Sequence, residues 1–75
     1  MSNIVETVSE AQETKDHLEG LGFNEQINMI RKLRQSWNFE SDYEENTENF
    51  TFIADDNSKL HISIDDAAKT ISCEV

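Results

Sequence analysis

Proline is absent from this 75-residue chain, glycine occurs twice, and Cys73 is the single cysteine. One cysteine cannot form an internal disulfide, and His17 and His61 lie too far from it in the sequence to suggest a set of metal ligands. No apolar run approaches the ~20 residues of a membrane-spanning helix, and the acidic start lacks the basic and apolar parts of a signal peptide. We therefore expect a cytoplasmic protein, intact from Met1, without metal, cofactor or membrane anchor.

Basic residues are also scarce. The chain has 16 Asp and Glu residues against 6 Lys and Arg, a formal net charge of -10. Charge of this size costs self-repulsion in the folded state and is typical of high solubility, of disordered tails, or of proteins that bind a positively charged partner. Apolar residues, at 36%, occur at patterned positions, unlike those of a disordered tail. Because a chain near this length buries only about 60% of its unfolded surface, we expect one domain, residues 1–75, of modest stability.

The first half of the chain has a helical period. Residues 3–19 contain neither Gly nor Pro, and their apolar residues share one helical stripe: Ile4, Val8, Ala11 and Leu18. Lys15 falls in the same stripe, where its methylenes can lie along apolar surface. The Gly20-Leu21-Gly22 segment then predicts a helix end and a tight turn, with glycine in the left-handed conformation.

A second helix is predicted to begin with Asn24 as its N-cap and Glu25 near its positive end. Its apolar face is wider and contains five residues: Ile27, Met29, Ile30, Leu33 and Trp37. The opposite face, with Asn28, Lys32 and Gln35, is expected to contact water. The chain's basic cluster also lies on this helix: Arg31, Lys32 and Arg34. We expect these residues to pair with acids of the sheet layer; the alternative is a surface for a second partner or for self-association.

Beyond Trp37 the period changes to two, which predicts strands. Apolar and polar residues alternate over residues 50–53, 60–64 and 70–75, and less clearly over residues 37–44, which we interpret as a leading strand. Residues 44–49 are interpreted as a longer turn, and residues 55–58 and 65–68 have the Asx-rich composition of hairpin loops. The predicted fold is α+β: two N-terminal helices (residues 1–37) cover one face of a three- to four-stranded antiparallel β-meander (residues 38–75).

The acidic residues are concentrated in the β half. Residues 1–37 hold 6 acids and 4 bases, whereas residues 38–75 hold 10 acids and 2 bases. Successive turns of a meander alternate between the ends of the sheet, so the turns at 44–49 and 65–68 should share one end. We predict a partner-binding anionic edge there, formed by Glu44, Glu45, Glu48, Asp65 and Asp66. The candidate set also includes Glu40 and Asp42 on the leading strand and Asp55 and Asp56 in the opposite turn. A secondary acidic stripe lies on the first helix: Glu6, Glu10 and Glu13.

Charge density indicates what such a surface could imitate. A folded chain of this mass exposes roughly 4,700 Å², so evenly spread acids would give about one per 300 Å². Duplex DNA, ~20 Å across, presents about one charge per 100 Å². The charge density of the protein would match that of DNA only if the acids were gathered onto about a third of its surface. The simplest alternative is that the acids provide solubility and occupy turns and helix starts.

Other residue groups carry weaker signals. Residues 55–59 have calcium-ligand chemistry but lack the EF-hand spacing, so a hairpin turn is the better interpretation. Cys73 shares a strand face with Ile71 and Val75, where we expect it to be buried and inert, which argues against an enzyme. His61 is expected on the exposed strand face. A net charge of -10 disfavours direct binding to nucleic acid.

No segment matches a family motif. In its general character, a very small, proline-free, acidic α+β protein without a catalytic set, the chain resembles phage-encoded inhibitors that occupy nucleic-acid-binding surfaces, including anti-restriction and anti-CRISPR proteins, and also colicin immunity proteins, which mask a basic nuclease. This resemblance is one of type, and it implies a non-enzymatic DNA mimic that inhibits a basic nucleic-acid-binding protein or nuclease complex in a host cytoplasm. The alternative is a small structural or regulatory subunit of a homo-oligomer, such as a homodimer, or of a larger assembly, with acidity serving solubility only.

Overall fold

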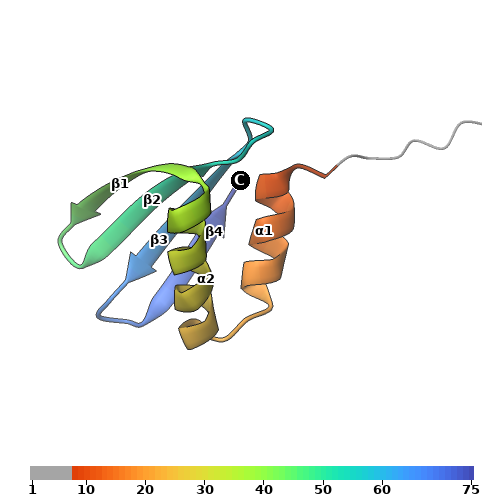
Figure 1. Cartoon of the computed structure of the whole chain (residues 1–75). Coiled ribbons are helices and arrows are strands. Elements are labelled where there is room, and N and C mark those ends of the chain that lie inside the picture. The colour runs from red at the N-terminus through yellow and green to blue at the C-terminus, as the bar shows by residue number, and fades with distance from the viewer. Residues whose placement is uncertain (1–7) are drawn as a thin grey trace, which may run out of the picture.

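The structure, a computed structural model, describes residues 8–75, which form two helices and one four-stranded sheet. The elements follow one another as α1 (Glu10–Glu19), α2 (Phe23–Ser36), β1 (Asn38–Glu44), β2 (Thr47–Ile53), β3 (Lys59–Asp65) and β4 (Thr70–Glu74). The strands are adjacent in chain order, and each neighbouring pair is antiparallel. Both helices lie on the same face of this meander (Figure 1). The predicted α+β fold is therefore confirmed, with four strands.

The core lies between the helices and the facing side of the sheet. Five core residues are fully buried: Ala11, Leu18, Phe52, Leu60 and Ile62. Four more are almost fully buried, namely Ile30, Leu33, Phe50 and Ile64. These positions follow the helical period on α1 and α2 and the period of two on β2 and β3, so burial of one face explains both patterns. No helix within residues 8–75 has the length and apolar character needed to cross a membrane.

The first helix is shorter than the sequence predicted. It begins at Glu10 because Ser9 is the N-cap, and the Ser9 hydroxyl accepts a hydrogen bond from the backbone N–H of Gln12. Ile4 lies outside the described residues. Val8 precedes the helix and is 50% exposed, so its predicted place in the apolar stripe is wrong. Ala11 and Leu18 are buried as predicted.

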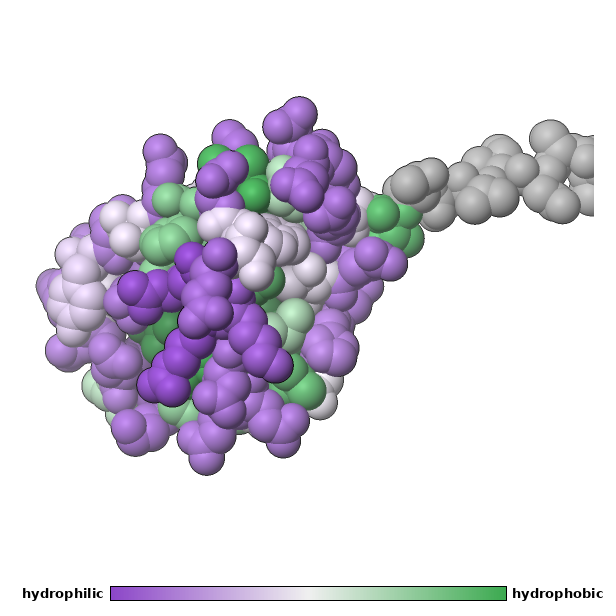
Figure 2. Space-filling model, in the orientation of Figure 1, coloured by the Kyte–Doolittle hydropathy of each residue, from purple (hydrophilic) through white to green (hydrophobic). Residues whose placement is uncertain are grey.

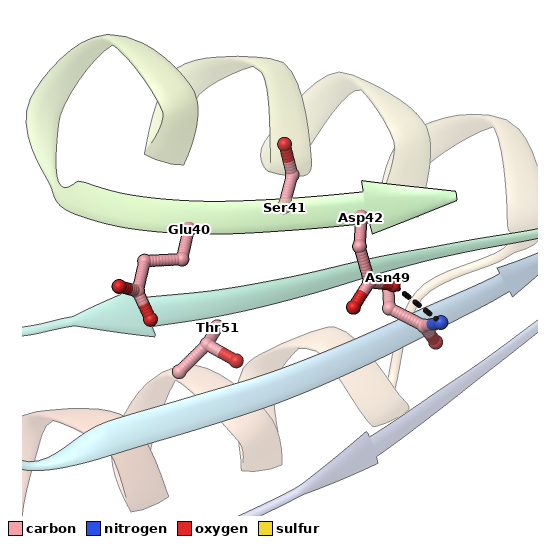
Figure 3. A pocket seen from close by; sticks show the side chains of 5 residues that line it. All are labelled: Glu40, Ser41, Asp42, Asn49 and Thr51. Atoms are coloured by element: carbon pink, nitrogen blue, oxygen red, sulfur yellow. Dashed lines mark hydrogen bonds between the residues drawn. The ribbon is translucent and has the colours of Figure 1, made fainter. Parts of the chain in front are cut away.

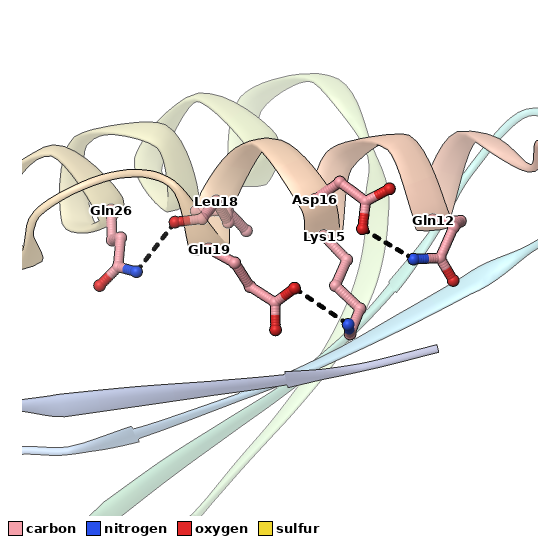
Figure 4. A network of polar contacts seen from close by, with 6 residues as sticks. All are labelled: Gln12, Lys15, Asp16, Leu18, Glu19 and Gln26. Carbon is pink, nitrogen blue, oxygen red and sulfur yellow. Dashed lines mark hydrogen bonds and ion pairs between the residues drawn. The ribbon is translucent and has the colours of Figure 1, made fainter.

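The connection between the helices also differs from the prediction. Gly20 ends α1 with φ -84, which is not in the left-handed region. The last turn tightens instead through 3₁₀-type hydrogen bonds, which the N–H groups of Gly20 and Leu21 donate to carbonyl oxygens three residues earlier. Helix α2 starts one residue after Gly22, which is its N-cap, so Asn24 lies within the first turn and is not the cap. The Gln26 amide donates to the carbonyl oxygen of Leu18 at 2.9 Å and ties the two helices together (Figure 4).

Trp37 lies just past the end of α2 rather than within it. Its ring still reaches the core, where it packs edge-on against Phe52 with 6.4 Å between ring centroids. The next residues form β1, so the leading strand predicted over residues 37–44 is confirmed at Asn38–Glu44.

The long turn predicted at residues 44–49 is wrong. Residues 45 and 46 alone make the turn, and Glu44 pairs directly with Thr47. Glu48 and Asn49 belong to β2, where Asn49 bonds to side chains of both neighbouring strands. The alternation is hard to recognise here because Glu48 is a polar residue at a helix-facing position, where an apolar residue is expected, and Asn49 is of a type common in turns. Glu45 adopts a positive φ of 54 to close the hairpin.

Strand β4 is less buried than predicted. Ile71 and Cys73 are half-buried against the core, and Val75 is 56% exposed. As the last strand of the sheet, β4 has a neighbour on one side only, so its apolar face is only partly covered. Burial of Cys73 and Val75 was therefore overestimated from their alternation.

Candidate partner-binding surface

The sheet has a face turned away from both helices, which we call the outer face. Residues that pair across the strands share a face, and the buried residues of β2 and β3 identify the helix-facing side. The remaining residues form cross-strand rows on the outer face. One row contains Glu40, Thr51 and His61, and the next contains Asp42, Asn49 and Ser63. A third row runs from Glu44 through Thr47 to Asp65 and Thr70.

Acids predominate on the outer face. The register places five acids there, at Glu40, Asp42, Glu44, Asp65 and Glu74, against the single base Lys59. With His61 neutral, these residues give the face a net charge of -4. Three of the acids follow one another at every second position of β1, and all three are exposed. Strand β1 therefore carries an unbroken line of carboxylates.

Polar side chains between the acids bond to one another across the strands. The Asn49 amide donates to Asp42 Oδ1 at 3.0 Å, and the Ser63 hydroxyl donates to Asn49 Oδ1 at 2.8 Å. Thr51 and His61 also lie within hydrogen-bond distance, at 3.2 Å. Figure 3 shows Glu40, Asp42, Asn49 and Thr51 on this side of the sheet, with Ser41 pointing to the other side. These bonds orient Asp42 on a rigid strand instead of a loop.

The predicted anionic edge is only partly assembled. The turns after β1 and β3 do share one end of the sheet, because the backbone N–H of Asp66 donates to the carbonyl oxygen of Asn46 at 3.1 Å. This contact brings the segments carrying Glu44, Glu45, Asp65 and Asp66 to that end. Glu48 is separated from them, since it shares the helix-facing side of β2 with Phe50. It borders a hollow with Arg31 and Arg34.

Two of the predicted acids at the turns stabilise local structure. Asp65 Oδ1 accepts hydrogen bonds from the backbone N–H groups of Ala67 and Ala68, each at 3.0 Å. At the opposite end, Asp56 Oδ2 accepts from the backbone N–H of Glu10 at 3.0 Å. The pKa of Asp56 lies below its ordinary value, mainly because of its hydrogen bond from the Ser58 hydroxyl and then its bond from Glu10. Asp55 is exposed in the same loop.

The secondary acidic stripe on the first helix is reduced to two described residues. Glu6 lies outside them, whereas Glu10 and Glu13 are exposed in the first turn of α1. Glu74 was missing from the predicted set although it faces outward beside His61. The period of two in the sequence, which places Glu74 on the face opposite Ile71 and Cys73, would have identified Glu74 as a residue of the outer face.

The basic cluster of α2 does not pair with sheet acids. Among the described residues the one ion pair is Lys15 with Glu19, at 3.1 Å within α1 (Figure 4). The Arg34 guanidinium instead lies over two aromatic rings, 5.7 Å from the centroid of Phe39 and 5.5 Å from that of Phe50. Our prediction of pairing with sheet acids was therefore wrong, because the aromatic rings of β1 and β2 lie directly under α2.

Cys73 is half-buried, and burial raises the pKa of its thiol, with a further contribution from nearby Glu19 and an opposing one from Lys15. A raised pKa makes the thiol a poor nucleophile at neutral pH. Within residues 8–75, the His, Cys, Asp and Glu side chains form no group of three suited to hold a metal ion.

Comparison with protein-family models, with curated proteins and with solved structures found no match to this chain. Its function must therefore be inferred from the arrangement of its own residues.

Proposed function

We propose that this protein binds a basic, nucleic-acid-handling protein through the outer face of its sheet and blocks that partner without catalysis. Charge density on this face carries the proposal. Three strands of seven residues and one of five, spaced ~4.8 Å apart and rising ~3.4 Å per residue, span about 420 Å². The net charge of -4 then corresponds to about one charge per 110 Å², close to the roughly 100 Å² per charge of duplex DNA.

The position of the acids supports the same proposal. They project from strands held in register by the sheet, so their spacing needs little ordering when a partner binds. A surface of Lys and Arg that normally contacts phosphates would find carboxylates at comparable density and would be attracted by the field of the whole chain. Nucleic acid itself would be repelled by the same field.

The alternative, a subunit of a larger assembly, receives less support. An obligate interface needs a large apolar patch. Large apolar residues that are exposed in the described part of the chain are Val8, Tyr43 and Val75. The helix-bearing side is largely hydrophilic, with apolar surface visible only between polar side chains (Figure 2).

The proposal is tested first by capture. The tagged protein is incubated with lysate at low salt and at ~0.5 M salt, where surface electrostatics are strongly screened. We expect nucleic-acid-binding proteins to be recovered at low salt and lost at high salt. Recovery of none of them under either condition would overturn the proposal.

The second step uses the captured partner and labelled duplex DNA. We expect this protein to displace the DNA, as measured by fluorescence anisotropy. A variant with Glu40→Gln, Asp42→Asn and Glu44→Gln should compete at least tenfold less well, because loss of local charge reduces steering and affinity. The matched control removes the same charge from the helices with Glu13→Gln, Asp16→Asn and Glu25→Gln. Equal effects of the two variants would show that net charge, not the outer face, directs binding.

A further inference from the structure

Strand β1 leaves one edge of the sheet open. It stands at the end of the strand order and pairs with β2 over its whole length, from Asn38 to Glu44. Hydrogen bonding alternates along an antiparallel pair, so every second residue of β1 directs its N–H and C=O groups to the open side. Within residues 8–75, no turn, loop or helix end forms a backbone hydrogen bond with a residue of β1.

The two edges of the sheet are not equivalent. At the other edge, β4 has five residues and is contacted by both helices, with Lys15 and Glu19 of α1 near Cys73. Strand β1 has seven residues, of which Phe39 lies under Arg34 of α2, and its far end extends away from both helices (Figure 1). An added strand would therefore meet fewer obstacles at β1.

The two faces of β1 have different chemistry. Glu40, Asp42 and Glu44 face outward, and none of them lies within ion-pair distance of a base in residues 8–75. On the helix side, Tyr43 is 62% exposed and Phe39 is half-buried. Phe39 also borders a hollow of about 340 Å³ with Arg31 and Arg34 of α2. A strand beside β1 would thus find carboxylates on one side and an aromatic surface with open space on the other.

We propose that the β1 edge accepts an extended segment of the basic partner as a fifth strand. The segment would have Lys or Arg at alternate positions, opposite the three carboxylates, and apolar or aromatic residues between them. Backbone hydrogen bonds would supply affinity, and the alternating side chains would supply specificity. This inference rests on the proposed function, since it specifies how a basic partner is held.

Charge complementarity also argues against a second copy as the occupant. Antiparallel pairing of two β1 strands centred on Ser41 would place Glu40 opposite Asp42 of the other copy, twice over. Like charges directly opposite one another destabilise a strand pair. Exposed edges are commonly protected by charged residues in this way. The same carboxylates that reject a second copy favour a strand with lysines at matching positions.

Two peptides of identical composition and one N-methylated analogue test the proposal. The first alternates Lys and Val, the second has its lysines consecutive, and the third is the alternating peptide with N-methyl groups on every second backbone amide. Binding is measured by fluorescence anisotropy at low salt, and hydrogen exchange of residues 38–44 is followed by NMR. We expect the alternating peptide to bind most tightly and to slow exchange in β1. N-methylation should weaken binding by about tenfold or more, because it removes hydrogen bonds and leaves the charge unchanged.

Protein variants provide the matched control. The variant Glu40→Gln, Asp42→Asn, Glu44→Gln should lose the preference for the alternating peptide, whereas Glu13→Gln, Asp16→Asn, Glu25→Gln should keep it. Equal binding of the three peptides, or binding that does not protect residues 38–44 from hydrogen exchange, would overturn strand addition. Neither result would contradict the capture of a basic partner by the outer face. Capture that is unaffected by neutralising the outer face would overturn the proposed function itself. The two failures are therefore distinguishable.

Discussion

Asp56 caps helix α1 through the backbone of Glu10: the carboxylate oxygen Oδ2 accepts the Glu10 N–H at 3.0 Å across a sequence separation of 46 residues. The next residue of the helix is held in the same way, because the Ser58 hydroxyl accepts the N–H of Ala11 at 3.1 Å. Ser58 in turn donates its hydroxyl proton to Asp56. The loop between β2 and β3 thus satisfies N–H groups that a helix start otherwise leaves unpaired.

The cap predicts a pH dependence of stability. The pKa of Asp56 is held below its ordinary value of 3.8, mainly by the Ser58 hydroxyl. Because folding lowers this pKa, the stabilisation is complete above the unfolded pKa and is lost as pH falls through the folded pKa. We expect the difference in melting temperature between wild type and Asp56→Asn to be constant from about pH 7 to 5 and to shrink below about pH 4. Circular dichroism melts would measure it, and a pH-independent difference would contradict the prediction.

Removal of the Ser58 hydroxyl should destabilise the fold. We expect Ser58→Ala to cost about 1 kcal/mol in the free energy of unfolding, because Ala11 N–H loses its acceptor and Asp56 loses a donor. Ser72→Ala is the control, since Ser72 is exposed on β4, and it should change stability by less than about 0.5 kcal/mol. Urea denaturation measures both. Equal effects would mean that the loop does not stabilise α1.

Phe52 should be the most sensitive core position. It is fully buried and its ring packs with those of Trp37, Phe39 and Phe50. We expect Phe52→Ala to cost about 3–5 kcal/mol, which approaches the whole stability of a small domain. Phe52→Leu should fold with a loss of roughly 1–2 kcal/mol. Denaturation midpoints would test this, and an unchanged midpoint for Phe52→Leu would be inconsistent with the packing described.

The Cys73 thiol should react slowly in the native protein. Its pKa lies above the ordinary value of 9.0, chiefly through burial, so little thiolate forms at neutral pH. We expect labelling by a disulfide reagent at about pH 8 to be much slower than in urea and to accelerate only above about pH 9. Lys15→Gln should slow it further, since Lys15 lowers this pKa. Equally fast labelling of folded and unfolded protein would refute the prediction.

Neutralising the carboxylates of β1 should stabilise the folded chain. Glu40→Gln, Asp42→Asn and Glu44→Gln reduce self-repulsion, so we expect the melting temperature to rise by a few degrees at low salt and the gain to fade at ~0.5 M salt. The helix variant Glu13→Gln, Asp16→Asn, Glu25→Gln should gain less, because Glu13 and Glu25 lie in first turns where the helix dipole favours acids. A larger gain in the helix variant would show that the β1 acids do not repel one another strongly.

Most of the strands could be predicted because one face of each is buried. The alternation at Phe50, Phe52, Leu60, Ile62 and Ile64 arises directly from packing against the helices. The β1–β2 hairpin was harder to define, since Glu48 and Asn49 lie on strand positions with turn-like residue types. The start of α2 was missed because its N-cap, Gly22, has no side chain to signal it, whereas the side-chain cap of α1, Ser9, was available in the sequence.

The α+β class, the order of the elements, the core positions of the central strands and the excess of acid in the second half all follow from the sequence alone, because each depends on local period or composition. Tertiary structure alone decided which acids share a surface. Asp56 was drawn into a helix cap, and Glu48 was placed on the helix side, away from Glu44. The physical reason is that a shift of one position along a strand reverses the face of a side chain, and hydrogen bonds between distant segments have no counterpart in the local sequence.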